Sequence, residues 1–306
     1  SSVVGLFRNE GHGYIVIRTL GVNKAHMAKN KLVQPFLKWA GGKRQLLPEI
    51  KKYIPKKIRI YREPFLGGGA VFLNLQPKRA MVNDINADLI SVYKVVRDDV
   101  ESLIRELKKH KNTAEHYYKI RILDRSHRIE QLSDVEKAAR IIYLNKTCYN
   151  GLFRVNNQGQ FNVPFGKYKK PAIVNETVLR AVSNYLNGAE IEFLNTDFDT
   201  SINRMGKSDF VYFDPPYDPV SDTSSFTGYS LHGFGREEQI RLCELCKRLD
   251  RRGCRFLLSN SYTDFIQDLY GDFKIEVVQA GRSINSDSAK RGKIPEVLVR
   301  NYDLDA

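Results

Sequence analysis

One short stretch of the sequence combines groups that could hold an amine. The apolar run Phe210 to Phe213 is followed at once by Asp214, Pro215, Pro216 and Tyr217. Such a run is typical of a strand buried on both faces of a parallel sheet, which places Asp214 at the carboxyl end of the strand, where ligands bind in such folds. The plainer alternative is a turn, since Asp-Pro pairs commonly start turns.

The chemistry of an adenine amino group favours a catalytic interpretation of this stretch. The exocyclic nitrogen is a poor nucleophile because its lone pair is delocalised into the ring. A carboxylate and a fixed backbone carbonyl that both accept hydrogen bonds from the amine would orient it and favour lone-pair localisation during attack on an electrophilic methyl group. Pro215 and Pro216 offer carbonyls without competing N–H donors, and Tyr217 offers a stacking face for a base.

A glycine-rich stretch has the composition of a cofactor loop. The segment Glu63 to Ala70, EPFLGGGA, places three glycines between a predicted strand and a predicted helix, so that a ligand can approach the backbone closely. It departs from G-x-G-x-x-G at Phe72. Asp84 ends the next predicted strand, fifteen residues after Gly69, where a carboxylate can accept both hydroxyls of a ribose. A helix-capping aspartate is the alternative.

A second glycine pair lies in the segment Lys38 to Arg44, KWAGGKR. A phosphate-binding P-loop would require glycine at position 37 and serine or threonine after the lysine, where this chain has Leu37 and Arg44. The nucleotide-triphosphatase interpretation therefore fails. Lys43 could instead hold a cofactor carboxylate while Trp39 covers an apolar or cationic part of the same cofactor.

Alternating strand and helix signals must position these groups, and their β-loop-α-β order favours a parallel sheet. Strands are predicted at Tyr61 to Phe65, Ala80 to Asn83, Ile191 to Leu194, Phe210 to Phe213, Cys254 to Ser259, Lys274 to Val278 and Glu296 to Asn301, and helices at Lys43 to Tyr53, from Ala70, at Ala87 to Val96 and at Arg236 to Leu249. Cys243 and Cys246 form a CxxC inside the last helix, where ordinary packing is favoured over zinc or redox use.

The sheet signal flanks an insertion that we expect at roughly 96 to 190. Residues 98 to 147 are helix-rich, and a Ser133 to Glu136 capping box precedes a helix that ends near Lys146. Residues 148 to 171 are rich in Gly, Asn, Pro, Tyr and Phe without periodicity. Such a segment is either an ordered recognition loop or a structural loop held by its aromatic residues.

Composition and charge narrow the class of protein. The chain has 306 residues, of which 42% are hydrophobic, and a net charge of +14. A field of that sign attracts polyanions, and aromatic and Asn residues among the basic ones at 146 to 170 favour nucleic acid over a merely solvated surface. The lack of a long apolar run and of a secretory signal predicts a cytoplasmic protein.

Residues 1 to 26 share no pattern with the rest of the chain. They are interpreted as a leader, vector-derived or disordered, in front of a native start at Met27. The alternation in Tyr14 to Ile17 leaves open a natural extension that docks as a strand.

Taken together, the motifs resemble the Dam-type DNA adenine-N6 methyltransferases of the α group, including the methylases of GATC-specific restriction systems of the DpnII type. The resemblance covers about Gln34 to Tyr302. The motifs occur in the family's order: FLKWAGGKRQLL, EPFLGGGAVFLN, VNDINADLI, YNGLFRVNNQGQFNVPFGKYKKP, TDF, DPPY, SNS, RSINS and KRGKIPEVLVRNY.

The resemblance implies an α/β, Rossmann-like methyltransferase fold with a mixed, mainly parallel seven-stranded sheet. Residues 27–95 and 191–306 would form the catalytic domain, and 96–190 an inserted helical target-recognition domain. S-adenosyl-L-methionine would be the cofactor and S-adenosyl-L-homocysteine the product. By matching position, the cofactor site would contain Trp39, Lys43, Glu63, Phe65, Gly67, Gly69, Asp84, Asp197, Phe198 and Asp214, and the catalytic motif Asp214, Pro215, Pro216 and Tyr217.

The resemblance also implies that the partner is double-stranded DNA. Lys38 matches a position that contacts the outer guanine of the site. Tyr149 could fill the space left by an extruded base, and Arg154 could donate two hydrogen bonds to guanine O6 and N7. The remaining matches in the recognition segment are Asn150, Leu152, Pro164 and Tyr168, for which loop packing is the alternative. Lys146, Lys167, Lys169 and Lys170 are interpreted as phosphate contacts or solvated charge.

The predicted reaction is methyl transfer from S-adenosylmethionine to N6 of a flipped adenine in duplex DNA, within GATC, with no metal and no covalent enzyme intermediate. One alternative is an N-methyltransferase of the same fold acting on RNA adenine or a protein amide. Others are a dinucleotide-dependent dehydrogenase and a non-catalytic DNA-binding protein. The resemblance leaves open a cognate restriction endonuclease as a partner.

Overall fold

The computed structural model describes residues 29–39, 41–220, 234–281 and 293–304. The expected leader at 1 to 26, the alternative strand at Tyr14 to Ile17 and the RSINS motif lie outside the described residues.

A seven-stranded sheet in the order β3-β2-β1-β4-β5-β7-β6 carries the candidate site. Its strands are β1 Tyr61–Glu63, β2 Arg79–Asn83, β3 Glu190–Leu194, β4 Phe210–Phe213, β5 Arg255–Ser261, β6 Lys274–Gly281 and β7 Lys293–Arg300. The first five pair in parallel, while β7 runs antiparallel to both β5 and β6. The predicted mixed, mainly parallel sheet is confirmed. The strand predicted from Tyr61 ends at Glu63, not Phe65, because Pro64 has no N–H to continue the ladder.

Strand β4 is buried on both faces, as its apolar run predicts. Phe210 and Tyr212 pack into the hydrophobic cluster on one face of the sheet, whereas Val211 and Phe213 pack into the cluster on the other. This alternation follows from the pleat of the strand, which sends successive side chains to opposite faces. The strand therefore fixes the start of the Asp214 segment from both sides.

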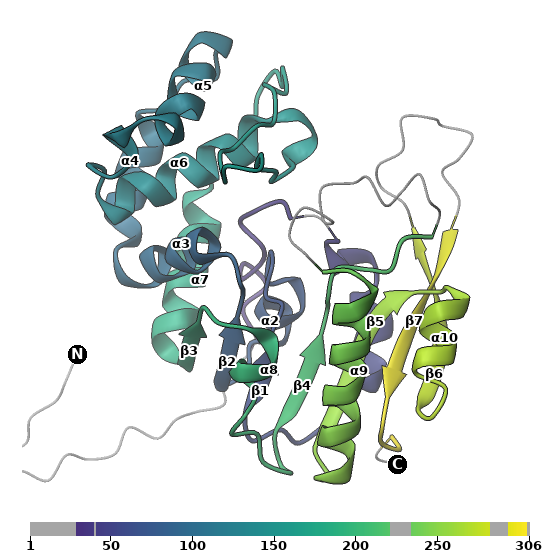
Figure 1. Cartoon of the computed structure of the whole chain (residues 1–306). Helices are drawn as coiled ribbons and strands as arrows, with labels where there is room; N and C mark the ends of the chain where they lie inside the picture. The colour runs from purple at the N-terminus through teal and green to yellow at the C-terminus, as the bar shows by residue number, and fades with distance from the viewer. Residues whose placement is uncertain (1–28, 40, 221–233, 282–292, 305–306) are drawn as a thin grey trace, which may run out of the picture.

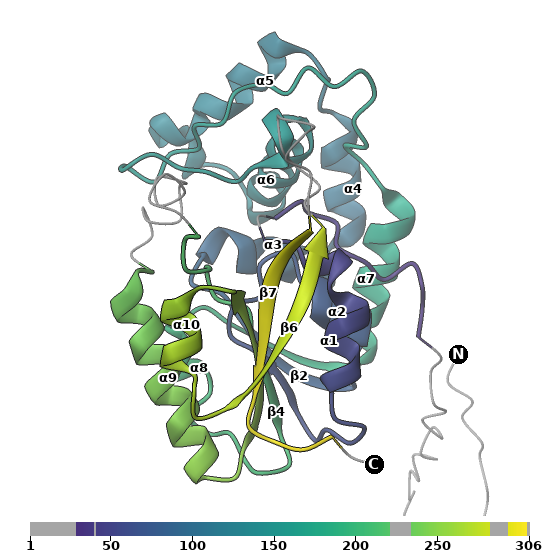
Figure 2. The same cartoon turned by 90° about the vertical axis from the view of Figure 1, so that its right-hand side faces the viewer.

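Helices cover both faces of the sheet (Figure 2). One face carries α1 Leu47–Tyr53, α2 Ala70–Leu75, α3 Ala87–Asp98 and α7 Glu176–Gly188, and the other carries α8 Phe198–Ser201, α9 Arg236–Arg251 and α10 Asp264–Leu269. Cys243 and Cys246 are buried in α9, which confirms that this CxxC packs inside a helix. The helix predicted from Lys43 starts as a 3-10 turn at Lys43–Gln45.

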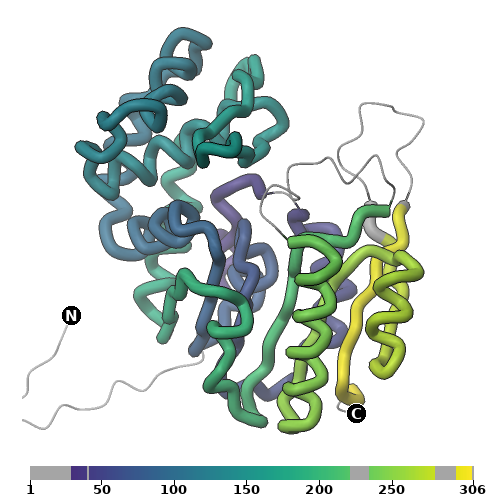
Figure 3. The backbone as a smooth tube through the Cα atoms, in the orientation of Figure 1, coloured from purple at the N-terminus to yellow at the C-terminus, as the bar shows by residue number. Residues whose placement is uncertain are grey.

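A second group of helices stands beyond one end of the sheet (Figure 1). It contains α4 Val100–Lys108, α5 Ala114–Arg121 and α6 Asp134–Thr147. The chain enters this group from α3 and returns through α7 to β3 (Figure 3). The capping box predicted for α6 is present, since the Ser133 side chain accepts from Glu136 N–H and the Glu136 carboxylate accepts from Ser133 N–H.

None of the helices within the described ranges has the length and apolar character that a membrane-spanning helix requires.

Candidate active site

Three carboxylates gather where neighbouring parallel strands end. Glu63 is the last residue of β1, Asp84 follows β2, and Asp214 follows β4, and these strands lie side by side in the order β2-β1-β4. Burial raises the pKa of Glu63 well above its ordinary value, and the charges of Asp214 and Asp84 raise it further. The sheet therefore brings together residues that are far apart in the sequence, as the strand order predicts.

Asp214 is held by two donors that reach the same carboxylate oxygen. Lys43 Nζ lies 2.9 Å from Asp214 Oδ1, and Ser259 Oγ donates to the same Oδ1 at 2.9 Å. Lys43 also donates to the Gly41 carbonyl at 2.7 Å. Burial raises the pKa of Asp214, while the Lys43 charge and the two hydrogen bonds partly offset that effect. Within the described ranges, no donor reaches the second oxygen, Oδ2.

The Tyr217 ring is fixed at its edge and covered on one face. Its hydroxyl donates to Glu296 Oε2 on β7 at 2.8 Å, and Lys43 Nζ lies 4.3 Å from its ring centroid. Burial raises the pKa of Glu296, and the nearby Lys43 charge lowers it. Sequence reasoning did not select Glu296, and the only available signal was its place inside the matched motif KIPEVLVRNY.

The two proline carbonyls of the segment differ in their partners. Gln239 Nε2 on α9 donates to the Pro216 carbonyl at 2.7 Å. Among the residues that the structure describes, none donates to the Pro215 carbonyl. Among the described residues, the Pro216 carbonyl thus has a side-chain donor and the Pro215 carbonyl has none.

The glycine loop needs glycine for reasons that the structure makes explicit. Gly67 has φ 48° and Gly69 has φ 65°, a region that side chains disfavour. A Cβ at position 69 would lie 2.6 Å from the Tyr93 hydroxyl, and one at 67 would lie 3.0 Å from Trp39 Cδ1. Gly67 N–H donates to Asp84 Oδ2 at 2.9 Å, so the loop and this carboxylate are locked together. Trp39 packs in the space that the missing side chains leave.

Asp84 does not cap a helix. Its Oδ1 accepts from Asn86 N–H at 3.0 Å, while Asn86 itself is the N-cap of α3 and accepts from Leu89 N–H. The helix-cap alternative for Asp84 is therefore wrong. The neighbouring Ile85 is 72% exposed, an unusual exposure for isoleucine beside a cluster of predicted ligand-binding residues.

Asp197 and Phe198 lie at the start of α8 beside two aromatic rings. Phe198 has ring centroids at 5.4 Å from Phe65 and 5.9 Å from Phe234. Arg241 on α9 pairs with Asp197 and lies 4.2 Å over the Phe198 ring. The structure thus brings Phe65 together with Asp197 and Phe198, and it adds Arg241 and Phe234, which no local motif indicated.

Asn145, a buried asparagine of α6, joins Lys38 to the segment after α6. Asn145 Oδ1 accepts from Lys38 N–H at 2.8 Å, and its Nδ2 donates to the Lys38 carbonyl at 2.7 Å and to the Gly151 carbonyl at 3.2 Å. Trp39 stacks on Phe153 with ring centroids 4.8 Å apart. The segment that carries the predicted cofactor residue Trp39 therefore contacts the predicted recognition segment directly.

Apart from Lys38, the predicted recognition residues lie on the segment that follows α6, with exposed or half-buried side chains. Tyr149 is 53% exposed directly after α6, and its N–H donates to the Pro164 carbonyl at 2.8 Å. Arg154 is exposed, and its Nε donates to Asn162 Oδ1 at 2.8 Å. The other predicted positions also belong to this segment: Asn150 with φ 56°, half-buried Leu152, exposed Lys167 with φ 53°, and Tyr168, whose ring lies 4.9 Å from Lys38 Nζ.

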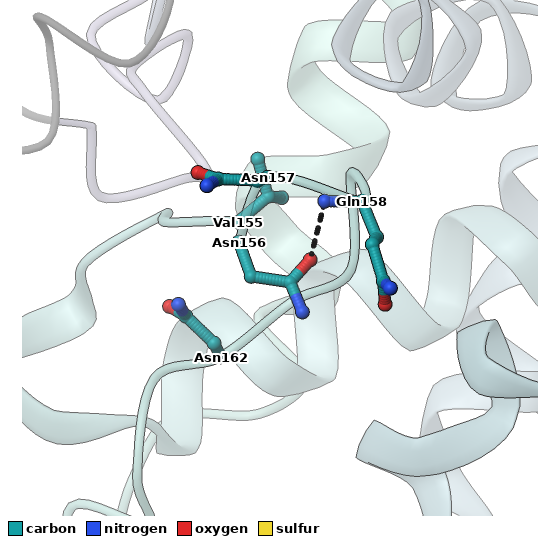
Figure 4. A pocket seen from close by; sticks show the side chains of 5 residues that line it. All are labelled: Val155, Asn156, Asn157, Gln158 and Asn162. Carbon is teal, nitrogen blue, oxygen red and sulfur yellow. Dashed lines mark hydrogen bonds between the residues drawn. The ribbon is translucent and has the colours of Figure 1, made fainter.

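The tip of the same segment forms a pocket of about 450 Å³ lined by amide side chains (Figure 4). Its lining residues are Val155, Asn156, Asn157, Gln158 and Asn162. Asn156 Oδ1 accepts from Gln158 N–H at 3.0 Å, the bond drawn in the figure, and from Gln160 N–H at 2.9 Å. None of these residues is among the site residues predicted from the sequence.

Side chains of the helical region between α4 and α6 hold the predicted recognition segment through polar contacts. Tyr117 Oη donates to the Val163 carbonyl at 2.8 Å, and Asp124 Oδ2 accepts from Phe161 N–H at 2.7 Å. Asn112 Nδ2 donates to the Tyr168 carbonyl at 2.7 Å. The segment is therefore ordered by side chains of the inserted helices as well as by its own aromatic residues.

Comparison with known proteins assigns the family. The model for the D12 class N6 adenine-specific DNA methyltransferases matches residues 39–284. The Type II methyltransferase M1.LlaDCHI of Lactococcus lactis subsp. cremoris is 46% identical over 279 residues, covering 90% of this chain and 98% of the relative. The Type II methyltransferase M.MjaIII of Methanocaldococcus jannaschii is 44% identical over 290 residues, with coverages of 88% and 99%. The DNA adenine methylase of Escherichia coli K12 is 39% identical over 278 residues, with coverages of 89% and 96%. The chain therefore belongs to the D12 class of N6 adenine-specific DNA methyltransferases.

Proposed function

We propose that this DNA adenine methyltransferase takes S-adenosylmethionine as its methyl donor and acts on N6 of an adenine flipped out of duplex DNA, within GATC. The observation that carries the chemical part is the pair of acceptors beside Tyr217. Both described donors to Asp214 reach Oδ1, and Gln239 occupies the Pro216 carbonyl. Asp214 Oδ2 and the Pro215 carbonyl therefore remain to accept the two N–H bonds of an amino group.

This arrangement suits attack by an amine rather than by an enzyme nucleophile. An amino group that donates both its hydrogens to fixed acceptors is oriented, and its lone pair is directed away from the ring plane toward the methyl donor. The Tyr217 ring supplies the stacking face that a flipped base needs. As the nitrogen gains positive charge in the transition state, the nearby carboxylate stabilises it because the site is largely buried.

The residues around the glycine loop fit a donor that carries a nucleoside and an amino acid. Asp84 follows β2 at a position where a ribose can be bound, and exposed Ile85 with the Phe65 and Phe198 rings provides apolar surface for a base. Asp197 is a polar acceptor beside those rings. Trp39, Lys43, Gly67 and Gly69 would complete the site. The sulfonium of the donor is already a strong electrophile, so these residues bind and orient it.

Glu63 contributes to that site from inside the protein. Glu63 is 3% exposed, and its carboxylate accepts a hydrogen bond from Tyr61 Oη at 2.5 Å. We infer that it supports the glycine loop from behind.

For DNA, we assign residues 96–190 as the target-recognition module and residues 27–95 and 191–306 as the catalytic part. The support is the exposure of Tyr149 and Arg154 on a segment that Asn145 ties to Lys38. Basic residues also lie near this segment: burial, and after it the charges of Lys38 and Arg44, lower the pKa of Lys146 to about 8. Base contacts are proposed for Lys38, Asn150, Leu152, Arg154, Pro164 and Tyr168, a phosphate contact for Lys167, and insertion into the stack for Tyr149.

Two relatives carry the name Type II methyltransferase, which supports a cognate restriction endonuclease as a functional counterpart. We infer that the protein works on chromosomal or phage DNA in the cytoplasm.

The test is methylation of plasmid DNA in vitro with S-adenosylmethionine. We expect N6-methyladenine by mass spectrometry, together with protection from nucleases blocked by adenine methylation at GATC and sensitivity to those that require it. Unchanged cutting with N6-methyladenine present would disprove the GATC assignment alone. Absence of N6-methyladenine would disprove the reaction, and parallel incubation with RNA and protein would reveal a different acceptor.

The raised pKa of Asp214 predicts an acid limit for the reaction. Only the ionised carboxylate accepts both from Lys43 and from the amine, so the single-turnover rate should fall as pH drops through the pKa of Asp214, which burial places above that of an ordinary aspartate. Ser259→Ala removes a hydrogen bond that lowers this pKa, so its acid limb should shift to higher pH. Identical acid limbs in the two proteins would show that another group controls the profile.

A further inference from the structure

Residues 214–218, the segment that follows β4, have no regular secondary structure. Buried side chains nevertheless form hydrogen bonds with the backbone of this segment at three points. Gln239 Nε2 donates to the Pro216 carbonyl at 2.7 Å, Asp218 N–H donates to Asn260 Oδ1 at 3.1 Å, and Ser261 Oγ donates to the Asp218 carbonyl at 2.6 Å. Gln239 is 2% exposed and Asn260 is fully buried. Buried amides are costly unless they are hydrogen-bonded, so side chains that served only to fill space would be apolar.

The direction of each amide is determined by its neighbour. Asn260 Oδ1 accepts two backbone N–H groups, from Asp218 at 3.1 Å and from Ser261 at 2.9 Å, so its Nδ2 must face the other way. That Nδ2 donates to Gln239 Oε1 at 3.0 Å. Gln239 must consequently point its own NH₂ group toward Pro216. These hydrogen bonds form a relay from Asn260 on β5 through Gln239 on α9 to the Pro216 carbonyl. Only one orientation of the two amides satisfies all of its bonds.

A second set of contacts anchors the end of the segment. The Asp218 side chain accepts from Thr263 Oγ1 at 2.8 Å and from Arg236 Nε at 3.3 Å. Asp218 is 2% exposed, so this ion pair is largely protected from water on the carboxylate side. Movement of the segment would require breaking these bonds together with the Gln239 contact.

We propose that Gln239 and Asn260 are positioning residues for methyl transfer. By occupying the Pro216 carbonyl, Gln239 fixes the peptide plane between Pro216 and Tyr217. That plane sets the direction in which Tyr217 leaves the segment and prevents the Pro216 carbonyl from competing for the amine. The acceptor pair is then Asp214 Oδ2 and the Pro215 carbonyl. The inference rests on the proposed function and adds the groups that fix its acceptor geometry.

Gln239→Met tests the donor. Methionine has a similar shape but cannot donate to the Pro216 carbonyl, so we expect the single-turnover rate of methyl transfer to fall about 10- to 100-fold, because small displacements of reacting groups cost up to about 100-fold. Dissociation constants for duplex DNA and for S-adenosylhomocysteine should stay within about twofold of wild type, because Gln239 is 2% exposed and both ends of its amide are bonded within the protein. Gln267→Met on α10 is the matched control and should leave the rate unchanged.

Gln239→Glu separates positioning from simple packing through pH. A protonated glutamic acid keeps an acceptor for Asn260 and an O–H donor for Pro216, whereas the ionised form has no donor and places negative charge against the carbonyl. The ratio of the Gln239→Glu rate to the wild-type rate should therefore rise as pH falls. A role in packing alone would give a ratio independent of pH.

The outcomes separate the inference from the proposed function. N6-methyladenine made by the wild-type protein tests the function, while the variant-to-wild-type rate ratios test the relay. Thermal unfolding of each variant identifies a loss of fold, and Gln239→Glu, which preserves shape, remains informative if Gln239→Met unfolds. A wild-type rate in folded Gln239→Met, or a Gln239→Glu ratio that does not change with pH, would overturn the proposal.

Discussion

Asp214→Asn should abolish methyl transfer, with a loss of about 1000-fold or more in the single-turnover rate, while DNA binding is retained. Removal of one preorganised hydrogen-bonding group from a reacting centre typically costs about 100- to 1000-fold. Here the substitution also removes the negative charge that faces the nitrogen as it becomes cationic. The asparagine NH₂ group could in addition turn toward the amine and repel it.

The protein should remain folded, because the shape of the side chain is kept and Lys43 retains its bond to the Gly41 carbonyl. Methyl transfer is measured by single-turnover incorporation and DNA binding by titration at several salt concentrations, where affinity should drop steeply as salt rises. Asp272→Asn is the control, since the Asp272 side chain is 82% exposed and lies outside the site. A rate within tenfold of wild type, or loss of DNA binding, would mean that the role of Asp214 is misassigned.

Arg154→Ala should remove discrimination at one guanine of the target site. A bidentate arginine contact to guanine contributes about 1–3 kcal/mol of discrimination, which is roughly 5- to 150-fold in the preference for GATC over a site with that guanine replaced. The structure supports this geometry, because Nε is engaged by Asn162 while no described residue binds the terminal nitrogens. Arg154→Lys should lose much of the same preference, since an ammonium cannot form the paired contact.

The preference is measured as the ratio of the specificity constants kcat/KM for oligonucleotides that differ at single positions. Lys169→Ala provides the comparison, because loss of an exposed lysine that we expect to contact phosphate should weaken binding to all sequences alike and reduce the salt dependence. If Arg154→Ala lowers activity equally on every oligonucleotide, Arg154 contacts the backbone rather than a base.

Much of the fold followed from local patterns. The apolar run before Asp214 predicted a strand buried on both faces, and β4 has this burial because its alternating side chains enter two cores. The capping box at Ser133 predicted the start of α6, since an N-cap and its reciprocal glutamate lie within one turn. The strand predicted from Tyr61 was wrong at its end, which is Glu63 and not Phe65, because apolar residues continue past Pro64 in the sequence.

The sequence by itself determined the elements, the chemical groups at the strand ends and the family, because those depend on neighbours along the chain and on motifs of fixed spacing. Only the tertiary structure decided which oxygens those groups leave available. Glu296 reaches Tyr217 across 79 residues, Gln239 reaches Pro216 across 23, and Asn145 reaches Lys38 across 107. Such partners come from different strands and helices, and no local periodicity encodes them, since a hydrogen bond is selected by the packing of elements in space.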